Sequence, residues 1–450
     1  MLMPHQQVDV EYAIDKEFVF NTNEPGSGKT LTAIETFKRR KNSGKTHKAI
    51  VIAPKSLLLP AWQNDIKKFA PEVSFAVSKA PNYLEGFKQN ADITALNNNH
   101  HSIRWLWENR HVLNPFTDLY VDESTAFKHH TSLRSKYLAK LAPLFIFRYL
   151  MTGTPSSLSI LELWHQIFLL DQGETLGKSF YKFRWNVCDQ IPQGMFTKWI
   201  DKPGIEDVIG TLIAPFTLNR KLDDCVSIPD NHTYTVPFTL NNKHLGKYRA
   251  MQADALLELD QGDVTAVNAA VLHDKLLQIA SGAIYHGDGS YTVLDTQRYE
   301  LIMDLVESRE QCVISFNWRH QRNGLIAAAE KRKLTYGIID GSTTPEQQNQ
   351  TVNDFQAGNL RMVLMHPRSG AHGLTLTSGT TCIWTSPTTE PERFEQLNRR
   401  IYRKGQTRKT ETILVSAEET LEPAKYEQLQ GRIDRAMSLR DILNNYTMIS

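Results

Sequence analysis

Residues Asn23-Glu24-Pro25-Gly26-Ser27-Gly28-Lys29-Thr30 decide the fold of this 450-residue chain. The stretch follows an apolar run, Phe18-Val19-Phe20, and precedes a helix-like segment, residues 31–40. A strand, a glycine loop, Gly-Lys-Thr and a helix form a cradle in which backbone N–H groups face phosphate oxygens. Lys29 would neutralise the β and γ charges of ATP, and the Thr30 hydroxyl would ligate Mg²⁺. The residues expected to contact the nucleotide in this loop are Gly26, Ser27, Gly28, Lys29 and Thr30.

The motif departs from its usual form at Asn23, where a glycine normally stands. The alternative interpretation is a chance Gly-Lys-Thr in a surface loop. A second copy, Gly44-Lys45-Thr46, fits that alternative, because it lies in a basic stretch with no strand before it. We therefore expect the first copy to bind phosphate and the second to be an ordinary loop.

The composition is that of a soluble globular protein long enough for two or three domains, with 41% apolar and 22% charged residues. No apolar run approaches the ~20 residues that span a bilayer, and the N-terminus lacks a signal-peptide pattern. We therefore expect a cytoplasmic protein. The four cysteines lie far apart, which argues against a zinc site or a disulfide framework. They are Cys188, Cys225, Cys312 and Cys382.

Short apolar, β-branched runs alternate with helix-like stretches in both halves of the chain, which predicts parallel α/β units. In the first half the expected strands are residues 18–21, 49–53, 119–121 and 145–151. In the second half they are residues 312–316, 336–339, 362–365, 381–384 and 412–415. The predicted fold is α/β, with two parallel-sheet lobes and a mainly helical insertion between them.

The middle of the chain, from about residue 161 to residue 280, has a mainly helical pattern. An alternating run at residues 233–240 predicts one strand there. The apolar anchors of the helical region are expected to be Trp164, Phe168, Phe180, Phe183 and Trp185. The expected domains are lobe 1 at residues 1–160, the helical region and linker at residues 161–270, and lobe 2 at residues 271–450.

An acidic pair follows the apolar run Leu119-Tyr120-Val121, about ninety residues after the glycine loop. Asp122 would hold Mg²⁺, mainly through water, and Glu123 would orient and deprotonate the attacking water. Asp-Glu after an apolar run is also common by chance. Its position within an α/β pattern favours the functional interpretation.

A third apolar run ends in Thr152-Gly153-Thr154-Pro155. The hydroxyls of Thr152 and Thr154 could hydrogen-bond to the acidic pair and sense the γ-phosphate. The alternative is a strand followed by an ordinary turn.

A basic segment, residues 399–409, carries six positive charges and no negative one, although the net charge of the chain is only +2. Such a run is often no more than a solvated face. Arg400 and Arg403, however, are three residues apart and would share one face of a helix. Transition-state charge on a γ-phosphate calls for the planar fork of arginine. If these arginines reach the ATP held by Lys29, hydrolysis requires the two lobes to close on each other.

Together these elements resemble the core of superfamily 2 helicases, and specifically its Swi/Snf-like branch. The resemblance covers nearly the whole chain in the family's order, and it implies two RecA-like lobes. Residues 2–6 look like the adenine-reading motif, with Gln6 as its carrier. The other motifs fall at residues 26–30 (I), 50–57 (Ia), 122–125 (II), 152–155 (III), 313–316 (IV), 369–376 (V) and 396–406 (VI).

The resemblance also implies further contacts with ATP and DNA. Gly373 of motif V is expected to bind the nucleotide, and Gln396 of motif VI is expected to be catalytic with Arg400 and Arg403. Contacts to the DNA backbone would be sequence-independent, as a motor requires. They are expected from Lys55, Ser56, Thr94, Ser315, Thr343, Arg368 and Gly370.

The chain departs from the family pattern at two places. Ser124-Thr125 follows the acidic pair where the family usually has Ala-His, so the usual histidine link to the second lobe is missing. Thr375 stands where the family usually has asparagine. Both departures bear on coupling between the lobes more than on hydrolysis.

The resemblance implies a monomeric ATP- and Mg²⁺-dependent DNA translocase, from a bacterium or a phage-infected host. It would act on duplex or branched DNA by branch migration or by remodelling forks and junctions, as in repair, recombination or replication, with no membrane partner. One alternative is an RNA or single-strand helicase of the same superfamily. Another is a non-hydrolysing scaffold with a degenerate core, which Asn23 and Ser124-Thr125 suggest and the retained Lys29 argues against. A small-molecule kinase would have no use for the second lobe.

Overall fold

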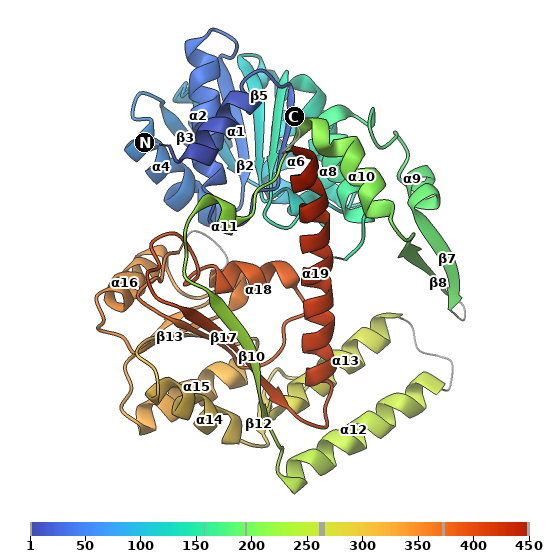
Figure 1. The fold of residues 1–450 in the computed structure, drawn as a ribbon, viewed down its shortest axis with the longest axis vertical. Helices are drawn as coiled ribbons and strands as arrows, with labels where there is room; N and C mark the ends of the chain where they lie inside the picture. Colours follow the sequence, from blue (N-terminus) through green and yellow to red (C-terminus); the bar gives the residue numbers. More distant parts are fainter. Residues whose placement is uncertain (1, 157, 194–195, 261–265, 371–373, 448–450) are drawn as a thin grey trace. The chain divides into compact units, whose positions relative to one another are not determined.

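The computed structural model describes residues 2–156, 158–193, 196–260, 266–370 and 374–447. The chain forms two compact units (Figure 1). Unit 1 consists of Met1–Ser227 with Arg432–Ser450, and unit 2 of Ile228–Gly431. Each unit has its own parallel sheet with helices, so the predicted α/β fold with two parallel-sheet lobes is confirmed. The expected three-part division into domains stays a prediction.

The sheet of unit 1 has seven strands in the order β3-β4-β2-β5-β6-β1-β9, and all its pairs are parallel. The strands are β1 (Phe18–Asn21), β2 (Lys48–Ala53), β3 (Phe75–Ser78), β4 (Ile93–Asn97), β5 (Phe116–Asp122), β6 (Phe147–Met151) and β9 (Thr217–Leu218). Parallel neighbours need crossover connections, which helices provide here. The helices of this part of unit 1 are α1 (Pro4–Ala13), which precedes the first strand, α2 (Lys29–Asn42), α3 (Lys55–Leu57), η1 (Leu58–Gln63), α4 (Asn64–Phe69), α5 (Tyr83–Lys88), α6 (His100–Glu108), α7 (Leu133–Leu141), α8 (Leu161–Asp171), α10 (Ile205–Ile213) and α11 (Leu222–Cys225), which follows the last strand.

Both faces of this sheet are buried, because successive strand residues point to opposite sides. Ile50 and Ile52 of β2 pack in one core with residues of α6, α7 and α8. Val51 packs in a second core with residues of α2. Since all strands run the same way, the loops that follow them open at one edge. The glycine loop, Asp122 and Thr152 therefore all lie at the carboxyl edge of the sheet.

The opposite, amino edge of the sheet is fixed by a buried ion pair. Arg40 of α2 is 1% exposed, and its guanidinium lies 3.2 Å from the carboxylate of Asp118 in β5. The same guanidinium donates to the carbonyl oxygens of Ala13 (2.7 Å) and Lys16 (2.6 Å). Thr46 donates its hydroxyl to Asp118 as well. Several partners thus compensate the burial of both charges.

The region after α8 contains an antiparallel ribbon where the sequence indicated mainly helix. Helix α9 (Phe180–Val187) leads into β7 (Cys188–Gln193), which pairs with β8 (Phe196–Asp201). Trp164 and Phe183 are buried as expected, but Trp185 is 57% exposed, so its assignment as an apolar anchor was wrong. Phe180, Phe183 and Val187 share the inner face of α9 by helical spacing, and Trp185 falls on the outer face.

The sheet of unit 2 has six strands in the order β10-β17-β16-β13-β15-β14, all parallel. The strands are β10 (Asn231–Phe238), β13 (Cys312–Ser315), β14 (Tyr336–Ile339), β15 (Met362–Met365), β16 (Thr381–Trp384) and β17 (Thr410–Ala417), with a separate hairpin of β11 (Ala283–Tyr285) and β12 (Tyr291–Val293). The helices are α12 (Asn242–Asp260), α13 (Ala266–Ala280), α14 (Gln297–Glu307), α15 (Arg319–Lys331), α16 (Pro345–Gln356), α17 (Pro367–Gly370) and α18 (Pro391–Asn398), and α19 (Glu422–Thr447) ends the chain. All five strands expected in the second half are present.

All four cysteines are free thiols, and all but Cys225 are buried. None of the helices in the described part of the chain is long and apolar enough to cross a membrane.

Candidate nucleotide and nucleic-acid sites

The glycine loop of unit 1 has the backbone of a phosphate cradle. Gly26 and Gly28 adopt φ values of 93° and 82°, which glycine takes without strain. The ammonium of Lys29 donates to the carbonyl oxygens of Asn23 (2.6 Å) and Glu24 (3.3 Å), so it lies within the curve of the loop. Ser27 is 1% exposed, and among the described residues no hydrogen-bond partner reaches its hydroxyl. A half-buried cation and an unused hydroxyl fit an anionic phosphate ligand.

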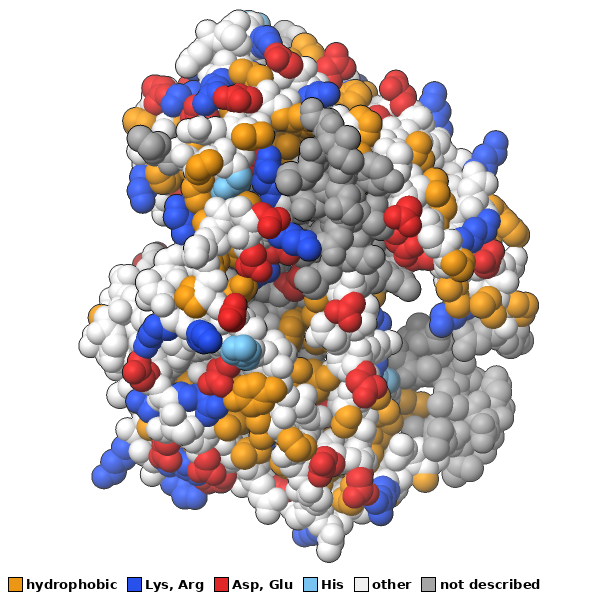
Figure 2. All heavy atoms as spheres, viewed as in Figure 1, with side chains coloured by type: hydrophobic (Ala, Val, Ile, Leu, Met, Phe, Trp, Pro, Cys, Tyr) orange, Lys and Arg blue, Asp and Glu red, His pale blue; other side chains and the backbone are white. Residues whose placement is uncertain are grey.

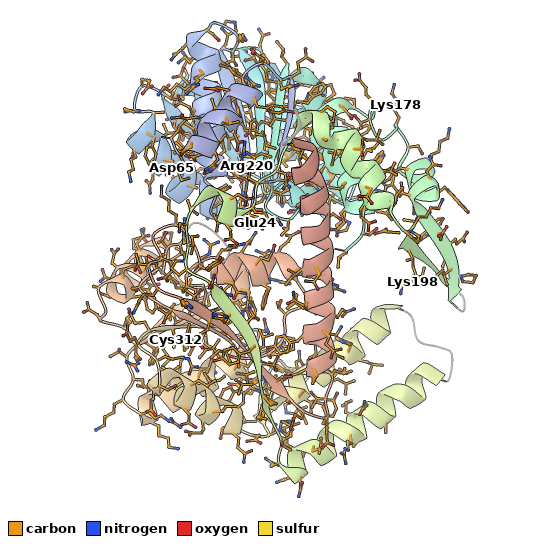
Figure 3. All side chains as sticks on the ribbon, in the orientation of Figure 1. Glu24, Asp65, Lys178, Lys198, Arg220 and Cys312 are labelled. Carbon is orange, nitrogen blue, oxygen red and sulfur yellow. The ribbon has the colours of Figure 1, made fainter. Side chains whose placement is uncertain are left out.

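Asn23 replaces the usual glycine and has a structural use. Its side-chain amide donates to one carboxylate oxygen of Asp9 at 2.7 Å, and Arg220 donates to the other at 2.7 Å. Asp9 is fully buried. Glu24, beside Asn23, donates its backbone N–H to the carbonyl of Arg220 at 3.0 Å, and both residues are labelled in Figure 3. The departure at Asn23 therefore ties the loop to α1 and to the segment after β9.

Gln6 lies directly against the glycine loop. Its amide nitrogen donates to the carbonyl oxygen of Gly28 at 3.1 Å, and its amide oxygen accepts from the backbone of Met3 at 2.9 Å. The neighbouring His5 ring bonds to the carbonyl oxygen of Ser27 at 2.9 Å. Helix α1 thus supports the loop from outside, and the adenine-reading role of Gln6 stays a prediction.

Asp122 ends β5 beside the loop and is 6% exposed. Burial raises the pKa of its carboxyl group, while the indole N–H of Trp62 (2.9 Å) and the charge of Lys29 lower it. Trp62, in η1, was not among the predicted site residues. Glu123 follows with a left-handed φ of 54°, an uncommon conformation for a non-glycine residue that clusters at functional sites. It turns the chain sharply out of the strand.

Thr152 and Thr154 lie at the same edge of the sheet, both buried. The hydroxyl of Thr152 accepts the backbone N–H of Thr154 at 3.2 Å. In the described residues neither hydroxyl bonds to the acidic pair. The two motifs are joined instead through Gln166 of α8, which accepts from the Ser124 hydroxyl (2.7 Å) and donates to the carbonyl of Pro155 (2.8 Å). Ser124 therefore has a partner that the sequence did not reveal.

In unit 2 the two motif VI arginines converge, but not on a helix face. Helix α18 ends at Asn398, so the expectation that Arg400 and Arg403 share a helix was wrong. Both guanidinium groups donate to the carbonyl oxygen of Leu374, at 3.2 Å and 2.7 Å. Gln396 is buried within α18. Gly373, the expected nucleotide contact next to Leu374, lies outside the described residues.

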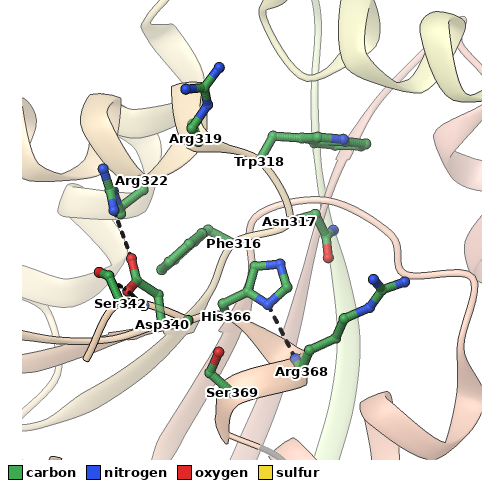
Figure 4. Close-up of a pocket in the computed structure, with 11 residues that line it drawn as sticks. Phe316, Asn317, Trp318, Arg319, Arg322, Asp340, Ser342, His366, Arg368 and Ser369 are labelled. Atoms are coloured by element: carbon green, nitrogen blue, oxygen red, sulfur yellow. Dashed lines mark hydrogen bonds and ion pairs between the residues drawn. The ribbon is translucent and has the colours of Figure 1, made fainter. Parts of the chain in front are cut away.

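A cavity of about 470 Å³ opens at the carboxyl edge of the unit 2 sheet (Figure 4). Its lining includes Phe316, Trp318, Arg319, Arg322, His366 and Arg368. Arg322 pairs with Asp340 at 2.7 Å. Although burial opposes it, hydrogen bonds from Ser342 and Arg322 lower the pKa of Asp340 to about 2. Arginines interleaved with aromatic rings suit the phosphates and bases of a nucleic acid.

Two family models match the chain in the same order as its units. A model described as SNF2-related domain matches residues 20–281, which is more than half of the chain. The helicase conserved C-terminal domain matches residues 297–405. The chain belongs to the SNF2-related family. It therefore has the domains of an ATP-using SNF2 ATPase or helicase, and the sequence-based assignment to the Swi/Snf-like branch is confirmed.

Similar proteins match most of the length of this chain. Protein p41 of Acyrthosiphon pisum secondary endosymbiont phage 1 is 26% identical over 424 residues, covering 91% of this chain and 89% of p41. The ATP-dependent DNA helicase DDM1 of Arabidopsis thaliana is 23% identical, covering 87% of this chain but 55% of DDM1. The chain spans 42% and 39% of two further relatives, from Bacillus subtilis and Danio rerio. Among solved structures, the Sulfolobus solfataricus SWI2/SNF2 ATPase core in complex with dsDNA is 21% identical, with a TM-score of 0.46, covering 100% of this chain and 94% of that one.

The DNA contacts expected of this SNF2 chain fall into two groups. Lys55 and Arg368 are exposed, at the start of α3 and on the cavity of unit 2. Thr94 lies in β4 and Ser315 ends β13, and each is 1% exposed, so neither side chain reaches the surface in this structure. Their contact with DNA stays a prediction.

Three more expected DNA contacts lie in turns and helix ends. The hydroxyl of Thr343 accepts the backbone N–H of Asp340 at 2.9 Å, so it stabilises a turn beside the cavity. Gly370 ends α17, and Ser56 lies in α3. The side chain of Ser56 lies outside the described part of the structure.

Proposed function

We propose that this chain is an ATP-dependent DNA translocase that couples ATP hydrolysis to movement on duplex or branched DNA. The observation that carries the proposal is the Lys29 ammonium within the glycine loop, at the same sheet edge as the buried carboxylate of Asp122. This arrangement lies within the SNF2-related match. Movement on DNA rather than another use of ATP is suggested by the arginine-lined cavity of unit 2.

Lys29 would bind the triphosphate by exchanging partners. It now donates to the neutral carbonyls of Asn23 and Glu24. Phosphate oxygens would form stronger, charge-assisted hydrogen bonds with the same ammonium. The Ser27 hydroxyl and the N-terminus of α2 would add donors to the cradle.

Thr30 and Asp122 would hold Mg²⁺, which neutralises charge on the β and γ phosphates. Glu123 would orient and deprotonate the attacking water, because its left-handed backbone turns it out of the strand beside Asp122. The Ser124–Gln166–Pro155 hydrogen bonds would keep this turn in register with Thr152 and Thr154. Loss of the γ-phosphate on hydrolysis could then be transmitted to Thr152 and Thr154, which follow β6.

Arg400 and Arg403 would complete the site from unit 2. Both now donate to the neutral carbonyl oxygen of Leu374. A γ-phosphate would offer them a stronger, charged acceptor. Each ATP cycle would close and reopen the two units, and this motion would advance the grip on DNA.

A second candidate is a helicase for RNA or single strands. The half-buried ring of Trp318 beside the arginines of the cavity favours it, because exposed bases stack on such rings. Duplex phosphates alone would not require this ring.

The deciding experiment measures ATP turnover with no nucleic acid and with single-stranded, duplex, forked and four-way-junction DNA and RNA. We expect duplex or branched DNA to stimulate turnover. Stimulation by RNA alone would refute the proposal. Arg403→Ala should abolish the stimulated turnover while DNA binding survives, whereas Arg249→Ala, an exposed arginine of α12, should behave like the wild type. Normal turnover in Arg403→Ala would rule out its role at the γ-phosphate.

A further inference from the structure

The β7–β8 ribbon projects from unit 1 and exposes both of its faces (Figure 1). Its base is anchored, because Asp201 accepts from the hydroxyl of Ser159 (2.6 Å) and from the backbone of Ile160 (3.0 Å). Beyond the base, Ile191 is 45% exposed and Ile200 37%. Two-stranded ribbons are only marginally stable in water by themselves. The exposed apolar area therefore indicates that a binding partner covers the ribbon when the protein functions.

Helix α9 and β8 together present a patch of aromatic and basic side chains, the ribbon patch: Tyr181, Lys182, Arg184, Trp185 and Trp199. Tyr181 is 60% exposed and Trp185 57%. The guanidinium of Arg184 lies 4.1 Å from the ring centre of Trp199 and 5.4 Å from that of Tyr181. The rings of Trp185 and Trp199 meet edge to face at 4.9 Å. Arg184 and Trp199 thus hold the exposed rings in a fixed array.

The ribbon patch and its surroundings are basic. No carboxylate in the described part of the chain forms an ion pair with Lys178, Lys182, Arg184 or Lys198. Asp201, one of the two acids of the segment, is engaged at the ribbon base. Figure 2 shows hydrophobic and Lys/Arg side chains interspersed over this corner of the molecule, and Figure 3 labels Lys178 and Lys198 there.

Rings and unpaired cations together decide between the partners that could cover such a surface. The centre of a protein–protein interface is depleted in lysine, because burying an uncompensated charge is costly. Nucleic acids with unpaired bases offer phosphates for the cations and π-faces for the rings. Bases inside a duplex are stacked on each other and cannot reach the rings.

We propose that the ribbon patch binds unpaired bases at the branch point of forked or junction DNA, by stacking on Trp185 and by contact of Lys182, three residues earlier on α9, with the adjoining phosphates. The inference rests on the proposed DNA translocase function and names its preferred substrate. The patch adds affinity for branched DNA and none for blunt duplex. It thereby supplies a choice of DNA structure that sequence-independent backbone contacts cannot make.

The test compares the full chain with the double variant Trp185→Ala/Lys182→Ala. Affinities for a fork and for a blunt duplex of equal length are measured by fluorescence anisotropy without ATP. The fork carries 2-aminopurine at its first unpaired position. We expect the double variant to bind the fork about tenfold more weakly than the wild type, the loss typical of one stacked base and one phosphate contact. Its duplex affinity and its duplex-stimulated turnover should stay unchanged.

The matched control is Leu133→Ala/Lys88→Ala, which removes an equally exposed apolar side chain and an exposed lysine elsewhere on unit 1. It should bind both DNAs like the wild type. In the wild type, fork binding should change the 2-aminopurine fluorescence, and in the Trp185 variant this change should be lost.

Unchanged fork affinity in the double variant would overturn the inference and point to a protein on the ribbon. Equal losses on fork and duplex would also overturn it, because the patch would then contact only backbone. Failure of the proposed function shows differently, as a wild type whose ATP turnover no DNA stimulates. The anisotropy comparison needs no ATP and reports on the patch in either case.

Discussion

Unit 1 contains the tripeptide Gly-Lys-Thr twice, at residues 28–30 and 44–46, and the two copies lie at opposite edges of one sheet. The first follows β1 and begins α2. The second follows α2 and precedes β2. Both glycines have left-handed φ values, 82° and 73°, so local backbone does not distinguish them. The two copies differ in their position relative to the neighbouring strand, because the first follows the end of β1 and the second precedes the start of β2.

The surroundings of the two lysines differ accordingly. Lys29 points into a loop of backbone carbonyls at the carboxyl edge, whereas Lys45 pairs with the exposed Asp15 on the surface. The two carboxylates of β5 repeat the contrast, because Asp122 lies at the carboxyl edge and Asp118 is bound to Arg40 near the amino edge. Ligands of parallel sheets bind at the carboxyl ends of strands. One edge is therefore arranged for chemistry and the other for stability.

The largest expected effect is a difference in ATP turnover between variants of Lys29 and of Lys45. Lys29→Ala removes the cation of the phosphate cradle and should lower DNA-stimulated ATP turnover by about 100- to 1,000-fold, as loss of a charge-stabilising donor does. Lys45→Ala removes a surface ion pair and should change turnover by no more than about twofold. Steady-state turnover with saturating duplex DNA measures both. A large loss in Lys45→Ala would break the comparison.

The two carboxylates of β5 should respond in opposite ways. Asp118→Asn leaves the buried Arg40 charge without its ion partner and should cost about 3 kcal/mol of unfolding free energy. Burial raises the pKa of both carboxyl groups, so each ionised group is disfavoured by its surroundings. Asp118, however, neutralises the fully buried Arg40, whereas no equally buried cation depends on Asp122 among the described residues. Asp122→Asn should therefore keep wild-type stability or gain up to about 1 kcal/mol, while turnover is lost. Urea denaturation followed by circular dichroism measures the stability of both variants, and a stability loss in Asp122→Asn as large as that in Asp118→Asn would contradict the assignment.

The glycines should show a smaller difference. A Cβ on residue 28 would come within 2.4 Å of the Gln6 amide, whereas one on residue 44 would meet nothing within 4 Å. The Gln6 side chain can swing aside, so Gly28→Ala should fold but lose the loop geometry that Gln6 supports. We expect its KM for ATP to rise about tenfold, and that of Gly44→Ala to stay unchanged, with only the backbone cost of about 1 kcal/mol that a left-handed alanine carries. Equal KM values in the two variants would show that Gln6 contact is irrelevant to nucleotide binding.

The apolar pattern of each strand explains which parts of the fold could be predicted from the sequence. β1, β14, β15 and β16 lie at their predicted residues because each is a continuous apolar run. β9 was missed because it has only two residues, and β4 because Thr94 and Asn97 interrupt its apolar residues. β3 was also missed, although it is as long as β1. The ribbon was missed because the aromatic residues before it repeat at helical spacing.

The residues of the candidate site also fall into those that the sequence could reveal and those that it could not. Asp122 could be found because it follows an apolar run directly, and Lys29 because it belongs to a glycine-loop motif after such a run. Trp62, Gln166 and Asp9 could not, because they act on residues far along the chain. Trp62 bonds to Asp122 60 positions later, and Gln166 bonds to Ser124 42 positions earlier. Such contacts exist only once the helices have packed on the sheet.

The smallest expected effect is a shift in the pH dependence of turnover. Asp122 must be ionised to hold Mg²⁺, so kcat/KM for ATP should fall as the pH drops through its pKa, which burial has raised above the usual value. The Trp62 indole donates to the ionised carboxylate at 2.9 Å and holds this pKa down. Trp62→Phe should therefore move the acid limb to higher pH, by less than about one unit for a single lost hydrogen bond. Tyr120→Phe is the matched control, because its hydroxyl donates to Asp118 at 3.3 Å instead. If the acid limb shifts equally in both variants, it reflects the stability of unit 1 and not one carboxyl group. A shift confined to Trp62→Phe would assign the acid limb to Asp122 at the carboxyl edge of the sheet.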